Sequence, residues 1–316
     1  MAKNGGEPFV PIGERHALEA ELEKLSQEAD SVKGGSSEQD QKRLLTALER
    51  SLHIRRQLHS ISSPQVADAC HQLCEACNWV ATQMLNAEPL KGALALLKRA
   101  EQLTEASERD RAITWNNLAC YYRRTGKLRT AVTYLERALA IEEHVDSADA
   151  AQTHLNLCAT LSQLQRRPEA IMHAQSALIR MYETLSPLML NGQLSDVSDG
   201  DGSGGENREQ VTVLCIAYHN LAVEYEYLKN FDAALTAYTS GLRWATRFLD
   251  ETHQIKGILR TAIDSIKAKT SAGTLRTDTG DDDSWARARK STDDELNSPG
   301  SSRSASVDSR DSPNGA

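Results

Sequence analysis

The sequence lacks the excess of positive charge that nucleic-acid binding needs. Its 44 acidic residues outnumber 36 Lys and Arg residues, which gives a net charge of −8 over 316 residues. Sequence-independent binding of DNA or RNA needs clustered positive charge, so we expect no nucleic-acid partner. The chain also lacks an apolar run long enough to span a bilayer, and residues 1–16 lack the apolar core of a secretion signal. We therefore expect a cytoplasmic protein that does not insert into membranes.

The common catalytic sequence motifs are absent as well. The chain has no Walker loop, no Gly-x-Gly-x-x-Gly after a strand, no Gly-x-Ser-x-Gly and no His-Glu-x-x-His, which are the motifs of nucleotide binding, nucleophilic catalysis and zinc proteolysis. Its six cysteines suit a reducing compartment better than a disulfide framework. We expect no cofactor, no metal and no enzyme activity.

Three of the cysteines have a spacing that carries a second interpretation. Cys70, Cys74 and Cys77 are spaced like the cluster-binding triad of radical S-adenosylmethionine enzymes, in which thiolates hold an iron–sulfur cluster. Those enzymes place the triad beside a strand, whereas here the residues fall on one face of a predicted helix. A reduced cysteine behaves there as a small apolar residue. We interpret the three as core residues and keep a metal- or cluster-binding protein as an alternative.

Small residues recur in a fixed phase along the chain. Two antiparallel helices approach closely only where their side chains are small, and larger residues fill the space on either side. Four sets with the same offsets therefore predict four helix hairpins. The first-helix positions are Ala81, Ala119, Cys158 and Ala222, and the second-helix positions are Ala93, Ala131, Ala170 and Ala234, then Ala100, Ala138, Ala177 and Gly241.

The most regular of these hairpins runs from Trp115 to Ala138, with Gly126 at its turn. Its order of Trp, Leu, Ala and Tyr, then Ala, Leu and Ala, resembles the tetratricopeptide repeat. Spacings near 40 residues and the sequence NNLA resemble the repeats of kinesin light chains and nephrocystin. The resemblance implies an all-α fold, a tetratricopeptide-like α-solenoid of antiparallel helix hairpins.

Composition divides the chain into three parts. Residues 1–37 form an N-terminal segment, in which 13–33 predict a helical arm. Residues 38–268 form the repeat domain; it opens with the second helix of an incomplete unit and closes with a capping helix at 255–268. Ser36 or Ser37 is expected to cap the opening helix, and Ser63 to cap the next, with Pro64 in its first turn. The Gly-, Ser- and Asp-rich stretches at 191–210 and 269–316 predict a disordered insertion and a disordered tail.

Asparagines precede the packing leucine in three of the units. The resemblance implies that asparagines near this position face a concave groove, where an amide can both donate to and accept from a peptide backbone. Alternatively, each asparagine caps or cross-links neighbouring helices, and both interpretations stay open. These residues are Asn117, Asn156 and Asn220, and the further groove candidates are Asn78, Asn116, Arg123, Arg124 and His219.

The tail contains one motif with a specific hypothesis. Trp285 follows Asp281, Asp282 and Asp283, an arrangement that resembles the cargo peptides read by kinesin light chain repeats. It predicts docking on the groove in cis or recruitment of a related groove in trans, against the alternative of a solvated acidic tail. Ser291, Ser298 and Ser312 lie in sequences typical of phosphorylation sites, where a phosphate adds negative charge.

These features favour a non-enzymatic adaptor or scaffold that binds a peptide or protein segment in its groove. A structural component of a cytoskeletal or ciliary assembly is the main alternative. It would bind through the convex face and the helix ends, and its location would follow the cytoskeleton or cilium. Both depend on the family resemblance rather than on a recognised partner.

Overall fold

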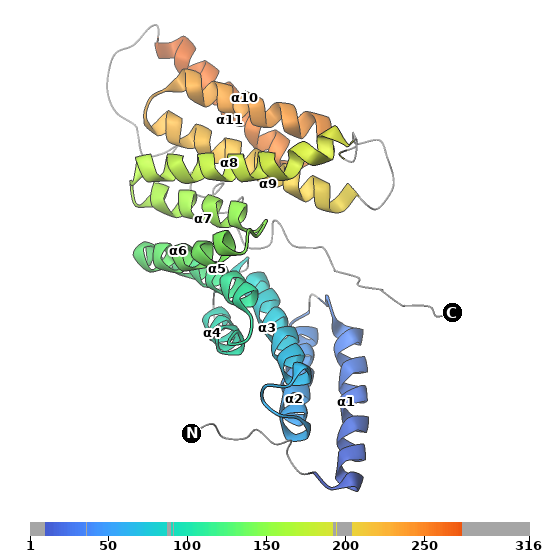
Figure 1. Cartoon of the computed structure of the whole chain (residues 1–316). Coiled ribbons are helices and arrows are strands. Elements are labelled where there is room, and N and C mark those ends of the chain that lie inside the picture. Colours follow the sequence, from blue (N-terminus) through green and yellow to red (C-terminus); the bar gives the residue numbers. More distant parts are fainter. Residues whose placement is uncertain are drawn as a thin grey trace. The chain divides into compact units, whose positions relative to one another are not determined.

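The computed structural model describes residues 10–35, 37–86, 90, 92–191, 194 and 204–273, with only the backbone described at 204–206 and 271–273. These residues form eleven α-helices and no strand (Figure 1). No helix among them is long and apolar enough to cross a membrane. The helices are α1 Ile12–Val32, α2 Glu38–Leu58, α3 Pro64–Leu85, α4 Ala93–Leu103, α5 Glu108–Arg124, α6 Leu128–His144, α7 Ala150–Gln163, α8 Arg167–Leu190, α9 Gly204–Tyr227, α10 Phe231–Phe248 and α11 Gln254–Gly273.

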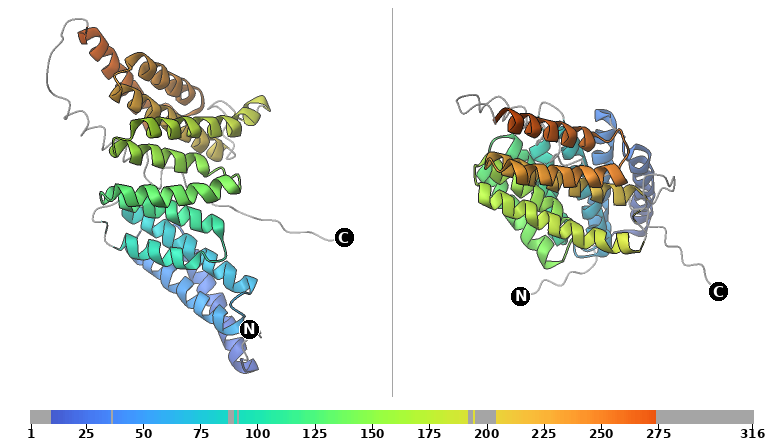
Figure 2. Two further views of the ribbon diagram at one scale, coloured as in Figure 1. Left: turned by 60° about the vertical axis from the view of Figure 1, so that its left-hand side comes forward. Right: turned by 90° about the horizontal axis from the view of Figure 1, so that it is seen from above.

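The chain divides into an N-terminal unit, residues 1–145, and a C-terminal unit, residues 146–316. The N-terminal unit stacks the hairpins α1–α2, α3–α4 and α5–α6, with α3 also packed on α2 and on α5 (Figure 2). The C-terminal unit contains the hairpins α7–α8 and α9–α10, and α11 packs on α10 and α9. This stacking of antiparallel pairs is that of a tetratricopeptide-like α-solenoid, as predicted.

The opening hairpin corrects one expectation, because its first helix is present. α1 packs along α2, and Arg50 binds Glu21 with a nitrogen–oxygen distance of 2.7 Å. The unit taken as incomplete is therefore a complete hairpin. Trp79 explains part of the difference. It takes the place of the recurring asparagine and packs with Ala29 and Val32 of α1 in one apolar cluster.

Two predicted boundaries also move. α9 begins at Gly204, so residues 204–210 are helical although we predicted 191–210 as a loop. α11 continues to Gly273, five residues past the predicted end of the capping helix at residue 268. Residues 207–210 belong to a helix whose later turns are strongly apolar. Because the first turn is polar, its composition resembles that of the preceding loop, and the sequence did not indicate that it is helical.

The small residues occupy the close-contact positions that their phase predicts. All of those on the second helices, from Ala93 to Gly241, are buried, and so are Ala81, Ala119, Cys158 and Ala222 on the first helices. Gly241 shows why size matters. A Cβ atom added there would lie 3.1 Å from Cβ of Tyr218 and 3.5 Å from Cδ1 of Leu259. The repeat pattern is thus a packing pattern.

The turns between the paired helices repeat as well. Gly126, Gln165 and Lys229 have φ values of 75°, 61° and 58°, and each follows the small first-helix residue of its unit by the same interval. In each turn the next N–H reaches back five residues to a helix carbonyl, as in the bond from Lys127 to Tyr122 at 2.8 Å. This is the Schellman end of an α-helix, which requires a left-handed residue. Only one of the three is a glycine.

Serines begin several helices at the expected places. Ser37 accepts a bond from the N–H of Asp40, which identifies it as the cap of α2. Ser63 accepts from the N–H of Val66, and Pro64 follows it in the first turn of α3. Both expectations are confirmed.

Candidate protein-binding surface

A polar ladder joins α3 to α5 in the N-terminal unit. The amide nitrogen of Asn117 donates to Oδ1 of Asn78 at 3.0 Å, and the nitrogen of Asn78 donates to Oγ1 of Thr114 at 2.9 Å. Asn78 is 6% exposed, whereas Asn117 is half-buried. For this pair the structure shows the cross-linking of neighbouring helices, which was one of the two open interpretations.

His71 and Asp110 extend the ladder toward the start of α5. Nδ1 of His71 lies 2.8 Å from Oδ2 of Asp110, and the Asp110 side chain is largely buried. The hydrogen bond to Asp110 raises the pKa of His71, and burial opposes it with a smaller effect. The charges of Asp110, Glu75 and Asp68 act in the same upward direction. Sequence analysis missed this pair because its members lie 39 residues apart in different repeats.

The other candidates on α5 differ in exposure. Arg123 is buried, with 4% of its surface exposed, so it belongs to the helix packing. Asn116 and Arg124 are half-buried on the same helix. The Oδ1 atom of Asn117 has no bond in the ladder and remains an acceptor. Asn116, Asn117 and Arg124 are thus the candidates on α5 with atoms that a partner can reach.

The candidates of the C-terminal unit lie deeper. Asn156 on α7 and both His219 and Asn220 on α9 are each 4% exposed. Nδ1 of His219 lies 3.4 Å from Oδ1 of Asn220. The structure therefore places these three side chains in the interior of the helix stack, and a role in a groove stays a prediction for them.

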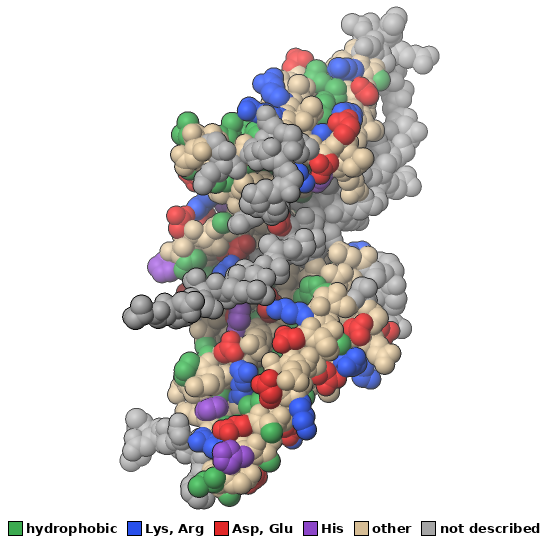
Figure 3. All heavy atoms as spheres, turned by 90° about the vertical axis from the view of Figure 1, so that its right-hand side faces the viewer, with side chains coloured by type: hydrophobic (Ala, Val, Ile, Leu, Met, Phe, Trp, Pro, Cys, Tyr) green, Lys and Arg blue, Asp and Glu red, His purple; other side chains and the backbone are tan. Residues whose placement is uncertain are grey.

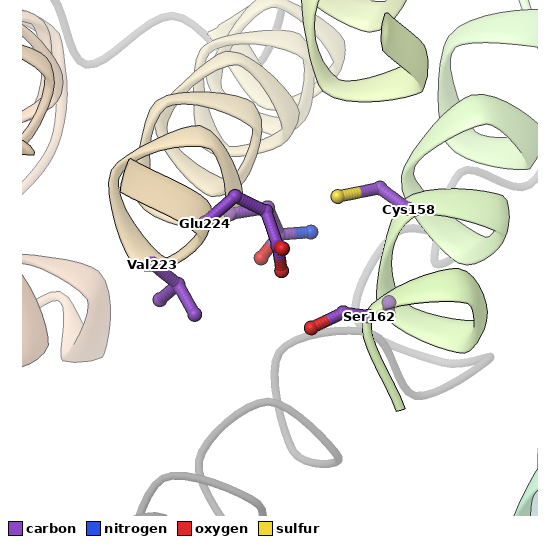
Figure 4. A pocket seen from close by; sticks show the side chains of 6 residues that line it. Cys158, Ser162, Val223 and Glu224 are labelled. Atoms are coloured by element: carbon purple, nitrogen blue, oxygen red, sulfur yellow. The ribbon is translucent and has the colours of Figure 1, made fainter. Parts of the chain in front are cut away.

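Asn220 nevertheless borders a small hollow between α7 and α9, which is partly open to solvent. Figure 4 shows Glu224 on α9 pointing toward Cys158 and Ser162 on α7. The exposed lining of this space is mainly apolar. Its lining residues are Cys158, Ala159, Ser162, Asn220, Val223 and Glu224.

A buried ion pair lies beside this hollow. Nη1 of Arg167 lies 3.1 Å from Oε2 of Glu224 and donates to the Ser162 hydroxyl at 2.7 Å. The guanidinium also lies 3.4 Å from the ring centre of Tyr227. Burial raises the pKa of Glu224, and bonds from Ser162 and Arg167 oppose the rise. Sequence analysis missed this pair, because its members lie 57 residues apart in different repeats.

The cysteine triad packs as core. Cys74 and Cys77 are buried in an apolar cluster with Leu73, and Cys70 is half-buried against the same cluster. Burial raises the pKa of Cys74 to about 11 and that of Cys77 to about 12. Metal ligation and nucleophilic attack use the thiolate, which these surroundings disfavour. Among residues with a described side chain, no three His, Cys, Asp or Glu residues are grouped to hold a metal ion.

Charged side chains of both signs are interspersed on the face shown in Figure 3.

Trp285 and the serines Ser291, Ser298 and Ser312 lie outside the described residues, as does most of the predicted tail. The hypotheses that depend on them therefore stay predictions.

Residues 112–147, which include most of α5 and all of α6, match the tetratricopeptide repeat. Residues 216–247, in α9 and α10, match it too. The chain contains tetratricopeptide repeats. Proteins built from such repeats are generally non-enzymatic scaffolds that mediate protein–protein interaction. No curated protein matches the chain.

Solved structures of similar arrangement include BtubC from P. vanneervenii, with 16% identity and a TM-score of 0.40 over 84% of this chain and 95% of that one. Another is a structure from Podosopora anserina described as putative kinesin light chain nearly identical TPR-like repeats, with 15% identity and a TM-score of 0.38 over 83% and 99%. Yeast Tom70 has 12% identity and a TM-score of 0.24 over 90% and 65%. These likenesses carry no argument about function.

Proposed function

We propose that the chain is a non-enzymatic adaptor whose first helices hold a peptide or protein segment. The observation that carries this proposal is that different side chains of α5, within a matched repeat, pack in the core and remain exposed. Leu118 and Ala119 are fully packed into the core, while Asn116, Asn117 and Arg124 on the same helix keep part of their surface exposed. Packing residues and recognition residues are thus separate sets.

The chemistry of the α5 candidates suits an extended peptide. Asn117 is fixed by its bond to Asn78, so its Oδ1 atom can accept from a peptide N–H without first losing rotational freedom. Arg124 adds a permanent positive charge that can bind a carboxylate. We therefore propose a partner segment with an acidic side chain near the end of α5.

The test is a peptide-display screen against the full chain, followed by binding measurements with the enriched peptide. The double variant Asn116→Ala and Arg124→Glu should weaken binding by about tenfold or more, since it removes polar contacts and reverses one charge. A matched control reverses Arg137 on the exposed side of α6. Equal affinity for both variants and the parent would reject the α5 surface.

A second candidate function is that of a structural component in a larger assembly, with cytoskeletal or ciliary location. The observation that favours it is the apolar surface of α8, where Met172 is 55% exposed, Met189 is 40% exposed and Leu190 is 86% exposed. Contiguous exposed apolar surface marks protein contacts, and we propose that these side chains belong to such a contact. Substituting these three by Ser or Gln should abolish assembly in cells while peptide binding persists. We also propose a cytoplasmic location and no nucleic-acid partner, and docking of Trp285 on the groove is a further candidate interaction.

A further inference from the structure

Aromatic and basic side chains gather where α8, α9 and α10 meet in the C-terminal unit. The rings of Tyr182 and Trp244 meet edge to face with centroids 5.8 Å apart, and Ile179 is 59% exposed one turn before Tyr182. These side chains form an apolar floor in contact with solvent. We call the set of Ile179, Tyr182, Tyr218, Arg243, Trp244 and Arg247 the α8–α10 face.

Hydrogen-bond donors border this floor. The hydroxyls of Tyr182 and Tyr218 lie 2.5 Å apart. Only one of them can donate to the other, so the accepting hydroxyl keeps its own proton for an outside acceptor. Burial and the bond to Tyr182 raise the pKa of Tyr218, while the charge of Arg243 opposes the rise. Tyr218 is therefore protonated at neutral pH.

The charge of the α10 surface is positive. Arg243 and Arg247 are exposed one turn apart, and α10 carries no acidic residue after Asp232. Arg247 also lies over the ring of Phe248, 4.9 Å from its centre. On α8, Arg180 is already bound to Asp146 at 2.6 Å, and Glu183 is an exposed acidic residue next to Tyr182. After α10, Asp250 is paired with Arg208 and Glu251 with Arg260. The α8–α10 face thus offers donors and positive charge beside an apolar surface.

The chain itself contains a segment of complementary chemistry. Residues 278–285 contain four aspartates, no Lys or Arg, and Trp285. The segment follows α11, which ends at Gly273 and packs on α10. Twelve extended residues reach about 40 Å, and the 18-residue helix α10 is about 27 Å long. The segment can therefore reach any point along α10.

We propose that residues 278–285 dock in cis on the α8–α10 face. The aspartate carboxylates accept bonds from Arg243, Arg247 and the tyrosine hydroxyl pair, and Trp285 covers the apolar floor at Ile179 and Trp244. Aromatic residues and Arg are the side chains enriched at the centres of protein interfaces. This docking is an alternative to docking of Trp285 on the groove and is independent of the partner that α5 binds, because its surface lies on α8, α9 and α10.

The test uses the full chain with a photo-crosslinking amino acid, p-benzoylphenylalanine, in place of Trp285. Irradiation should join this position to residues 179–182 or 243–247 of the same chain, identified by mass spectrometry. Arg243→Glu with Arg247→Glu should lower that yield about tenfold, because two attractive ion pairs become repulsive. The matched control, Arg129→Glu with Arg137→Glu, reverses two exposed charges on α6 and should leave the yield unchanged.

A second variant covers the case in which the α10 substitutions disturb folding. Asp281→Asn, Asp282→Asn and Asp283→Asn leave the α8–α10 face intact and should give a similar loss of crosslinking. Equal yields in all variants, or crosslinks spread over other surfaces, would overturn the proposal. Crosslinks that join two chains would also overturn it, in favour of a second copy as the occupant. None of these outcomes depends on peptide binding at α5.

Discussion

At the residue scale, Asn78 is the side chain on which the polar ladder depends, since it bonds to Asn117, Thr114 and the Cys74 sulfur. Asn78→Ala should lower the free energy of unfolding by about 2 kcal/mol, because it leaves buried polar partners unsatisfied. Urea denaturation of the full chain measures it. The control Gln72→Ala removes an exposed amide of the same helix and should change stability by less than about 0.5 kcal/mol. Equal effects of the two substitutions would contradict a structural ladder.

His71 gives the ladder a pH dependence of known sign. Its pKa is raised in the folded chain by the bond to Asp110, so the charged pair stabilises the fold below the unfolded pKa. That contribution is lost as the pH rises through the folded pKa. The stability difference between the parent and His71→Gln should therefore be larger at pH 5.5 than at pH 8.5, by less than about 1 kcal/mol for a pair this exposed. Asp110→Asn should remove the same dependence, and a difference that grows with pH would refute the assignment.

The asparagines show where sequence reasoning about the site ends. The pattern located them correctly on first helices beside the packing leucine, but an amide can bond to a neighbouring helix or to a ligand with equal ease. The choice between the two depends on which residue of the next repeat faces it. Thr114 and Asn117 face Asn78, and that pairing across repeats cannot be read from one repeat alone.

At the element scale, the left-handed turns separate two effects of glycine. Gly126 has a φ of 75° with open space around its Cβ position, whereas Gly257 lies inside α11, also with open space. Gly126→Ala should therefore lower the free energy of unfolding by about 1 kcal/mol, and Gly257→Ala should raise it by about 0.5–1 kcal/mol. Thermal and urea unfolding measure both. Changes of the same sign would show that backbone conformation does not decide these positions.

Lys229 permits the reverse experiment at the equivalent turn of the next matched repeat. Its φ of 58° is costly for a side chain that carries a Cβ. Lys229→Gly should raise the free energy of unfolding by about 0.5–1 kcal/mol. Gln165 is less suitable, because its side chain accepts a bond from Arg167 at 2.8 Å. A loss of stability in Lys229→Gly would mean that the lysine side chain makes a larger contribution than its backbone strain costs.

The elements themselves were predictable to different degrees. Small residues at Ala81, Ala93 and Ala100 predicted both helices of a hairpin because close approach needs them. α1 was recognised only as an arm, since its pairing with α2 uses Val32, Leu44 and ion pairs rather than the alanine pattern. The start of α9 was missed because a helix tolerates a Gly- and Asn-containing first turn once its later residues are packed.

At the scale of the whole molecule, each unit contains its own buried apolar clusters. Leu73 lies in a cluster formed by α2, α3 and α4, and Leu214 lies in the large cluster of the C-terminal unit. Stacked-hairpin proteins distribute stability among repeats and their nearest neighbours. Repeats of this kind make local loss of structure possible without complete unfolding.

Leu214→Ala should therefore increase amide hydrogen exchange mainly in α9, α10 and α11, and Leu73→Ala mainly in α2, α3 and α4. Each substitution removes a side chain that is 0% exposed and should cost about 2–5 kcal/mol in its own unit. Hydrogen exchange followed by mass spectrometry at low urea resolves the two patterns, and the two variants serve as each other's control. If either substitution accelerated exchange equally in α1 and α10, the chain would unfold as one cooperative body, and stability would not be divided among its hairpins.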